Sequence, residues 1–295
     1  MREYTQEIIR ALENVSAGSA VGAVPAVRPP ERKAVVRVVK DLQALLFPLC
    51  FSRHDPGTGD AELLERALNE LEEQARASLC FDAGCPDRDG SLSVRAEETV
   101  REFASRLPGV KSMLLKDIEA LYEGDPAAKR REEVMICYPG FYAISIYRMA
   151  HELYLLHLPL IPRIMTEFAH EKTGIDIHPG ATIGEYFFID HGTGIVVGET
   201  TVIGNHVKLY QGVTLGAKSF ELDEQGNPVK GIKRHPDIGN NVVIYANATI
   251  LGGDTVIGDR CVIGGNSWLI RSVEPGVTIA YVPPESRIGR KEVVS

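Results

Sequence analysis

A six-residue period of branched aliphatic residues constrains the fold of this chain more than any other feature of the sequence. Gly directly follows many of these positions and suits tight corners, where a Cβ would clash. Such a repeat predicts a parallel β-helix, in which three short strands complete one triangular coil and stacked coils bury a column of aliphatic side chains. The period is carried by Ile177, Ile183, Ile189, Val197, Ile203, Leu209, Leu215, Ile238, Ile244, Ile250, Ile257, Ile263 and Leu269.

Two insertions interrupt this period and indicate where reactive side chains gather. Eight residues instead of six separate Ile189 from Val197, and the predicted bulge carries Asp190 and His191. A whole loop, 216–237, is extruded further along the chain. Insertions in solenoids collect on the functional face, so these two segments predict the location of the site. The basic residues of the longer loop are Lys218, Lys230, Lys233, Arg234 and His235.

The first half of the chain lacks the six-residue period and is predicted to be helical. Apolar positions at helical spacing predict helices over 31–46, 61–79, 94–107, 110–122, 140–157 and 162–172. Pro108-Gly109 is expected to stop the third of these helices, and Gly174 to end the last. Residues 16–30 suit a flexible linker after a short N-terminal helix, and an ordered extended arm fits them nearly as well.

The predicted fold class is therefore α+β, with an N-terminal all-α helical domain followed by a left-handed parallel β-helix of hexapeptide repeats. The predicted divisions are an N-terminal helix and linker (1–30), the helical domain (31–174), the β-helix (175–275) with its extruded loop 216–237, and a C-terminal tail (276–295).

Composition and charge exclude several classes of protein. The longest uncharged run after the linker within the helical half, 134–147, is too short to span a membrane, and the N-terminus does not resemble a signal peptide. Five scattered cysteines favour a reducing cytoplasm. The spacing of Cys80 and Cys85 is not that of a usual zinc ribbon, so no metal is expected. A net charge of −8 argues against nucleic acid as a partner.

Several sequence blocks resemble the serine O-acetyltransferase family of hexapeptide acyltransferases. They are Gly-Ile-Asp-Ile-His-Pro at 174–179, Asp-His-Gly-Thr-Gly-Ile-Val-Val-Gly-Glu-Thr at 190–200, Gln-Gly-Val-Thr-Leu-Gly at 211–216, Arg-His-Pro at 234–236, Gly-Asp-Pro-Ala at 124–127, and 140–151. The likeness covers roughly residues 115–270 in detail. It implies transfer of the acetyl group of acetyl-CoA to the hydroxyl of L-serine, the first step of cysteine biosynthesis.

Acyl transfer from a thioester to an alcohol needs a general base and dipoles that receive the developing oxyanion. His191 is expected to project from the bulge beside Asp190, and a neutral imidazole suits the base. The alternative is that His191 has only a structural role, in a turn or at a cap. The base also needs a carboxylate on its other ring nitrogen, and the resemblance implies Asp176 in that role.

A zwitterionic amino acid needs carboxylates for its ammonium group and a cation for its carboxylate. The resemblance implies Asp125 and Asp190 for the ammonium group and Arg234 for the carboxylate, with His235 nearby. The fork of an arginine side chain binds both carboxylate oxygens. Taken without the resemblance, Asp125 is typical of a helix start, and His178 is more often structural.

The resemblance also implies the cofactor site and the partners. Coenzyme A would lie between neighbouring β-helices of a homotrimer, near Gly216, Ala217, Lys218 and Ala246, and no metal is implied. Lys218 could meet a phosphate, although a solvated lysine is an equal reading. A hexamer through the helical domains and inhibition by cysteine are further implications. Many members end in an Ile that enters O-acetylserine sulfhydrylase, whereas this chain ends in Ser295, so either the sequence is cut short or the protein does not bind that partner.

Two other classes compete with this interpretation. One is a hexapeptide acyltransferase with a sugar or amine acceptor, for which neither Gly-Asp-Pro-Ala at 124–127 nor the Arg234-His235 pair is expected. The other is a zinc carbonic anhydrase or a purely structural β-helix. A zinc site needs three histidines, usually with two close in sequence. The histidines of the repeat region include no such near pair: His178, His191, His206 and His235.

Overall fold

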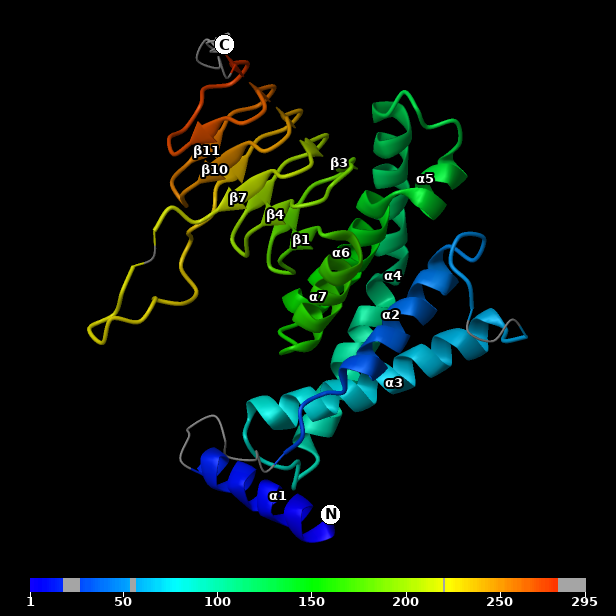
Figure 1. Ribbon diagram of the computed structural model, residues 1–295. Coiled ribbons are helices and arrows are strands. Elements are labelled where there is room, and N and C mark those ends of the chain that lie inside the picture. The colour runs from blue at the N-terminus through cyan, green and yellow to red at the C-terminus, as the bar shows by residue number, and fades with distance from the viewer. Residues whose placement is uncertain (18–26, 54–56, 220, 281–295) are drawn as a thin grey trace, which may run out of the picture.

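A helical region precedes a parallel β-helix in the computed structural model, which describes residues 1–17, 27–53, 57–219 and 221–280 (Figure 1). Residues 18–26 of the predicted linker and residues 281–295 of the predicted tail lie outside these ranges. The helices are α1 (Arg2–Ala17), α2 (Arg32–Leu46), α3 (Asp60–Asp82), α4 (Ser91–Gly124), α5 (Arg131–Cys137), α6 (Pro139–Leu155) and α7 (Ile161–Thr173).

The β-helix consists of short parallel strands that stack in three sheets. Sheet A has the order β1-β4-β7-β10-β13, sheet B the order β11-β8-β5-β2 and sheet C the order β14-β12-β9-β6-β3. The strands are β1 (Asp176–Ile177), β2 (Thr182–Ile183), β3 (Phe188–Asp190), β4 (Val196–Val197), β5 (Val202–Ile203), β6 (Lys208–Tyr210), β7 (Thr214–Gly216), β8 (Asp237–Ile238), β9 (Val243–Ile244), β10 (Thr249–Leu251), β11 (Val256–Ile257), β12 (Val262–Ile263), β13 (Trp268–Leu269) and β14 (Thr278–Ile279).

The register of the sheets follows the predicted six-residue period. Ile177 lies beside Val197 of the next coil, and Val197 lies beside Leu215 of the coil after that. The aliphatic residues of the period are buried, except that Leu269 in the last coils is half-buried. The prediction of a left-handed parallel β-helix with an aliphatic column is therefore confirmed. Its final strand, β14, lies beyond residue 275, the predicted end of the β-helix, and pairs with β12.

The three sheets meet at three corners, and two of these carry the insertions predicted from the sequence. The C–A corner lies between sheets C and A and includes residues 191–195, 211–213 and 245–248. The A–B corner lies between sheets A and B and includes residues 178–181, 198–201 and the extruded loop 217–236. In Figure 1 that loop, drawn in yellow, projects away from the coils.

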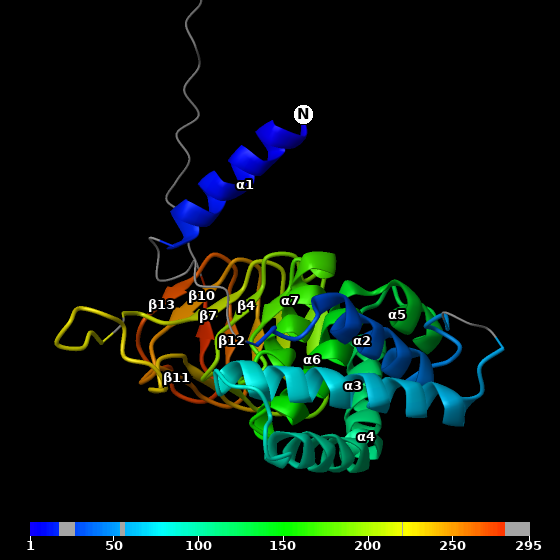
Figure 2. The same ribbon diagram turned by 90° about the horizontal axis from the view of Figure 1, so that it is seen from below.

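The helical region packs against the first coils of the β-helix through α4, α6 and α7 (Figures 1 and 2). Helix α1 lies apart from the other helices in both views. Helix α7 ends at Gly174, whose φ of 70° gives the left-handed terminus that glycine tolerates best. Among the helices of the described residues, none is long and apolar enough to cross a membrane.

The prediction that Pro108-Gly109 stops a helix is wrong, because α4 runs through Pro108. A proline inside a helix removes one backbone donor and crowds the preceding turn, which costs about 3 kcal/mol. The apolar stripe stays in phase across it, since Phe103 and Leu107 before the proline and Val110 and Leu114 after it are all buried. Burial of large side chains at about 1.5–3 kcal/mol each outweighs the cost.

A buried ion pair joins the helical region to the first coil. Arg148 of α6 donates to both carboxylate oxygens of Asp117 in α4, each at 3.0 Å. The same guanidinium donates to the carbonyl oxygens of Ile183 and Gly184, and Asp117 accepts the backbone N–H of Phe187. Burial raises the pKa of Asp117, and the charge of Arg148 opposes that shift. The pair thus satisfies backbone groups at the corner between β2 and β3.

Replacing Arg148 with Ala leaves a fully buried carboxylate without its cation. We expect the free energy of unfolding to fall by about 3–5 kcal/mol, as for other broken buried ion pairs. Urea unfolding followed by circular dichroism measures this loss. The matched control is Arg131→Ala, which breaks an ion pair with Glu119 that is about half exposed on the arginine side and should cost less than about 1 kcal/mol. Equal losses in the two variants would contradict this account.

Candidate functional site at two corners of the β-helix

His191 occupies the C–A corner directly after β3, as the predicted bulge required. Its side chain is 70% exposed, and its Nδ1 lies 3.6 Å from Oδ1 of Asp190. Its backbone φ is 56°, in the left-handed region that non-glycine residues adopt at a cost in free energy. An exposed imidazole in this conformation projects from the coil and is accessible to a ligand.

Gly192 is what allows this bulge to close onto the coil. Its φ is 84°, and a Cβ at this position would lie 2.5 Å from Cδ1 of Ile175 and 2.9 Å from Cγ2 of Ile189. Any side chain here would displace buried aliphatic groups. The sequence Asp190-His191-Gly192 therefore presents the imidazole at a fixed place on the corner.

Asp125 reaches the same corner from the helical region. Taken without the family resemblance, Asp125 is predicted to start a helix. In the structure it instead directly follows the end of α4. Its Oδ1 accepts the backbone N–H of Ala127 at 2.8 Å, and its Oδ2 accepts the hydroxyl of Tyr138. The hydrogen bond from Tyr138 is the first cause of the lowered pKa of Asp125, and the charge of His191 contributes.

Tyr210 completes the C–A corner and, like Tyr138, was not among the predicted residues. It pairs with Asp190 across β3 and β6. Burial raises the pKa of the Tyr210 hydroxyl, with further contributions from Tyr245, Asp190 and Asp125. Three predicted residues, Asp125, Asp190 and His191, thus come together at one corner. The position of Tyr210 just before the recognised 211–216 block was the only signal for it in the sequence.

Arg234 and His235 lie at the A–B corner, at the end of the extruded loop. The Arg234 guanidinium is 2.5 Å from Oε2 of Glu199, and Oε1 of Glu199 accepts the hydroxyl of Tyr154 at 3.1 Å. The backbone N–H groups of Arg234 and His235 both donate to Oγ1 of Thr200. The base of the loop is thereby fixed to the corner below it. Glu199 and Thr200 were present in the recognised 190–200 block but had been assigned no role.

His235 is buried and neutral at ordinary pH. Its Nδ1 accepts the backbone N–H of Thr200 at 3.1 Å, so its Nε2 carries the proton in the neutral ring. Burial, followed by the charge of Arg234, lowers the pKa of His235 to about 4. The ring fits because the neighbouring residue is Gly198, where a Cβ would lie 2.0 Å from the imidazole.

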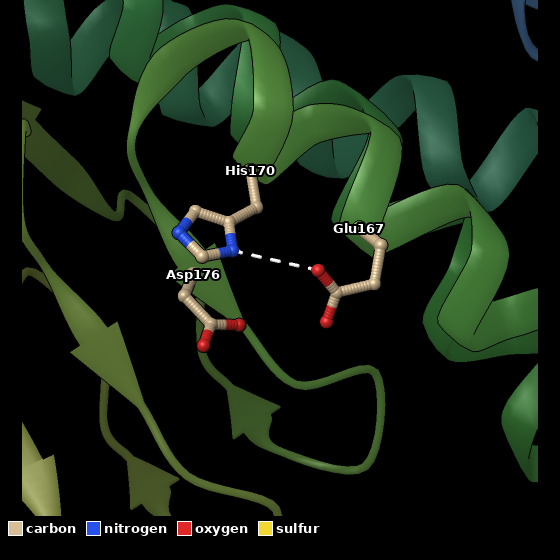
Figure 3. A group of neighbouring side chains, drawn as sticks. All are labelled: Glu167, His170 and Asp176. Carbon is tan, nitrogen blue, oxygen red and sulfur yellow. Dashed lines mark ion pairs between the residues drawn. The ribbon is translucent and has the colours of Figure 1, made fainter.

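Asp176 lies in β1 of sheet A, where its carboxylate is close to Glu167 and His170 of helix α7 (Figure 3). Its carboxylate is 4.0 Å from the guanidinium of Arg163 in the same helix. No hydrogen bond joins Asp176 to His191 within the described part of the chain. Glu167, His170 and Asp176 carry metal-ligand atoms near one another, but Arg163 also pairs with Glu167 and supplies positive charge to the group.

The residues predicted to bind the cofactor also lie at both the A–B and the C–A corners. Gly216 ends β7, and Ala217 and Lys218 follow at the A–B corner. Ala246 lies after β9 at the C–A corner, where its carbonyl oxygen accepts the backbone N–H of Asn266. The side chain of Lys218 is exposed.

The two insertions that the sequence predicts to mark the site lie at different corners of the coil. The C–A and A–B corners lie at opposite ends of the strands of sheet A, because each strand of that sheet runs from one corner to the other. Each predicted set of residues, for the amino acid and for the cofactor, has members at both corners. The histidines are spread as well, since His206 lies at the third corner, stacked on Tyr186 at 4.4 Å.

The lowered pKa of His235 predicts a pH dependence of stability. Between about pH 6.5, the ordinary value, and pH 4, unfolded chains bind a proton at this residue and folded chains do not. The free energy of unfolding should therefore fall as the pH falls through this window. His235→Gln, which cannot titrate, should show a smaller fall between pH 7 and pH 5 in urea unfolding. Identical pH dependences in both proteins would show that His235 titrates normally when folded.

Comparison with known proteins identifies close relatives of the chain. It is 48% identical over 267 residues to a plasmid-encoded serine acetyltransferase of Synechococcus elongatus, which covers 85% of this chain and 81% of the relative. A crystal structure of Entamoeba histolytica serine acetyltransferase 1 in complex with L-cysteine matches with a TM-score of 0.72 at 32% identity, covering 95% of this chain and 98% of that one. A serine acetyltransferase in complex with CoA matches with a TM-score of 0.55 at 28% identity, covering 85% and 97%. No protein-family model matches the chain.

Proposed function

The chain belongs to the serine acetyltransferase family, and we propose that its two corners combine across a subunit boundary to carry out the reaction of that family. The reaction moves the acetyl group of acetyl-CoA to the hydroxyl of L-serine. The observation that carries the proposal is the division of the predicted residues between the C–A and A–B corners. A site that needs both sets is complete only when the C–A corner of one copy meets the A–B corner of another.

A homotrimer satisfies this requirement. If each C–A corner meets the A–B corner of the next copy, three heterologous contacts close a ring and give three equivalent sites. The outer face of sheet A, which would line these contacts, carries exposed apolar side chains: Val196 is 37% exposed and Trp268 is 68% exposed. Association of two such trimers through the helical regions would give the hexamer that the family resemblance suggests.

His191 acts as the general base in this proposal. Its neutral imidazole takes the proton of the serine hydroxyl while the serine oxygen attacks the thioester carbonyl carbon. The tetrahedral intermediate then collapses, the carbon–sulfur bond breaks, and the departing sulfur takes the proton back from His191. The products are O-acetyl-L-serine and CoA. A base of this kind contributes about 10²–10⁴-fold to the rate.

Asp176 orients the imidazole and stabilises its charged form in the transition state. Its position on sheet A and the lack of a bond to His191 within the chain favour an approach from the neighbouring copy. The exposed side of His191 is then the side that faces the neighbour.

The amino acid is held at both ends by charge. Its ammonium group binds Asp125 and Asp190 at the C–A corner, and its carboxylate binds Arg234 of the next copy, with Nε2–H of His235 nearby. Glu199 pairs with Nη2 of the Arg234 guanidinium. A guanidinium has five N–H donors, so other donors remain for the substrate carboxylate.

The acetyl donor lies in the groove between neighbouring β-helices. Gly216, Ala217 and Lys218 of one copy and Ala246 of the next would line opposite sides of that groove. Cysteine offers the same ammonium and carboxylate groups as serine, so it competes for the same three charged residues. The L-cysteine complex of the Entamoeba relative supports this inhibition.

Replacing His191 with Ala removes the proposed base. We expect kcat to fall by roughly a hundredfold or more, with the affinity for acetyl-CoA nearly unchanged. Thiol release from acetyl-CoA in the presence of L-serine measures the rate. A matched control is available in His206→Ala, since His206 is another corner histidine, with a φ of 57°, and it should retain normal turnover. Normal turnover in His191→Ala would remove this residue from the mechanism.

Replacing Arg234 with Ala leaves the serine carboxylate without its cation. The loss of a desolvated, charge-assisted hydrogen bond is worth about 2 kcal/mol, so the KM for serine should rise at least about tenfold. The KM for acetyl-CoA should stay the same, and Lys230→Ala, which removes an exposed cation from the same loop, should change neither constant. If acetyl-CoA binding weakens instead, Arg234 contacts the cofactor and not the amino acid.

A further inference from the structure

Tyr138 and Asp125 are joined by a hydrogen bond that none of the roles above requires. The Tyr138 hydroxyl donates to Oδ2 of Asp125. The second carboxylate oxygen, Oδ1, accepts the backbone N–H of Ala127 at 2.8 Å. Two donors from different segments therefore hold the carboxylate on both sides, and Asp125 itself is half-buried.

Backbone hydrogen bonds on both sides hold the main chain of Tyr138 in place. Tyr138 is the N-cap residue of α6, with extended dihedral angles of φ −85° and ψ 119° that suit a residue before proline. Its N–H donates to the carbonyl oxygen of Val134 at the end of α5, and its carbonyl oxygen accepts the N–H of Tyr142 in α6. Both backbone groups are thus engaged in the helices on either side. The main chain of Tyr138, and with it the Cβ that carries the ring, is therefore held between the two helices.

The hydroxyl is a stable donor at every working pH. Burial, the hydrogen bond to Asp125 and the nearby charges, Asp190 among them, raise the pKa of Tyr138. A phenol of raised pKa cannot serve as a base, and it stays protonated beside the carboxylate. The influence of Asp190 also shows that Tyr138 lies near both carboxylates proposed for the ammonium group.

We propose that Tyr138 is a positioning residue for the amino-acid ammonium group. By holding the Asp125 carboxylate in one orientation, it presents a pre-ordered acceptor to the ammonium group of the substrate. Each carboxylate oxygen has room for more than one hydrogen bond, so both can still accept from the ligand. Pre-ordering removes the entropy cost of fixing the side chain when the ligand binds. This inference rests on the proposed role of Asp125 in the same site.

The opposing interpretation is that Tyr138 only braces the connection between α5 and α6. The two readings differ in what they change. Loss of a brace lowers the stability of the fold and the active fraction of the protein, so the apparent kcat falls while both KM values stay unchanged. A positioning residue affects the binding of amino acids selectively, and it acts only while Asp125 is present.

The test is Tyr138→Phe, which removes the hydroxyl and keeps the ring. We expect the KM for serine to rise by roughly three- to tenfold, with kcat and the KM for acetyl-CoA nearly unchanged. Tyr142→Phe is the matched control, because Tyr142 is one turn further along α6 and its hydroxyl makes no hydrogen bond within the described residues; it should change none of these constants. Loss of the hydrogen bond should also raise the pKa of Asp125, so the KM for serine should begin to rise at a higher pH on acidification.

A double-mutant cycle with Asp125→Asn separates the possible failures. Tyr138→Phe should have little further effect on the KM for serine when Asp125 is already replaced. If Asp125→Asn alone leaves that KM unchanged, the proposed role of Asp125 fails. If Asp125→Asn raises it and Tyr138→Phe does not, the positioning inference alone is overturned. Independent, additive effects of the two changes on the KM for serine, or a fall of the apparent kcat in Tyr138→Phe with both KM values unchanged, would assign Tyr138 to bracing the fold.

Discussion

Parallel stacking of coils is the constraint on which the rest of the structure depends. Each backbone segment of a coil bonds to the same segment of the next, as Ile177, Val197 and Leu215 do in sheet A. A residue inserted at one corner therefore stays at that corner, at one end of the strands, and does not reach the corner at the other end. This constraint assigns His191 to one corner and Arg234 to another. In the proposed reaction, which uses both residues, a second copy of the chain therefore supplies one of them.

The helical region supplies what the coil cannot make by itself. A β-helix repeats the same few backbone conformations, so its corners offer few directions for side chains. Helix α4 ends beside the first coils and delivers Asp125 to the C–A corner, and α6 delivers Tyr138 to it. The buried pair of Arg148 and Asp117 holds both helices against the first coil. The stability of that contact and the geometry of the proposed amino-acid site are linked for this reason.

The sequence predicted the coil, its inward residues and both insertions, because the period is local and each unit repeats the same geometry. Counting the units in threes would also have assigned His191 and Arg234 to different corners. The prediction that Pro108 ends a helix used only the local effect of proline on the backbone. The burial of Phe103 and Val110 on either side outweighs that effect. Tyr138 had no local signal, since its contact with Asp125 depends on the path of the chain between α4 and α6. The proposed partner of Asp176 lies on another copy, which the pattern of one chain does not contain.

Complementation between two inactive variants tests the shared site most directly. His191→Ala and Arg234→Ala chains are purified separately, mixed in equal amounts, unfolded and refolded together, and assayed at a serine concentration where each alone is nearly inactive. If one site takes His191 from one copy and Arg234 from the next, random assembly of trimers leaves about a quarter of the sites with both residues intact. Activity near a quarter of that of refolded wild-type protein is the predicted result. Activity no greater than that of the separate variants would show that both residues act within one chain and would contradict the account.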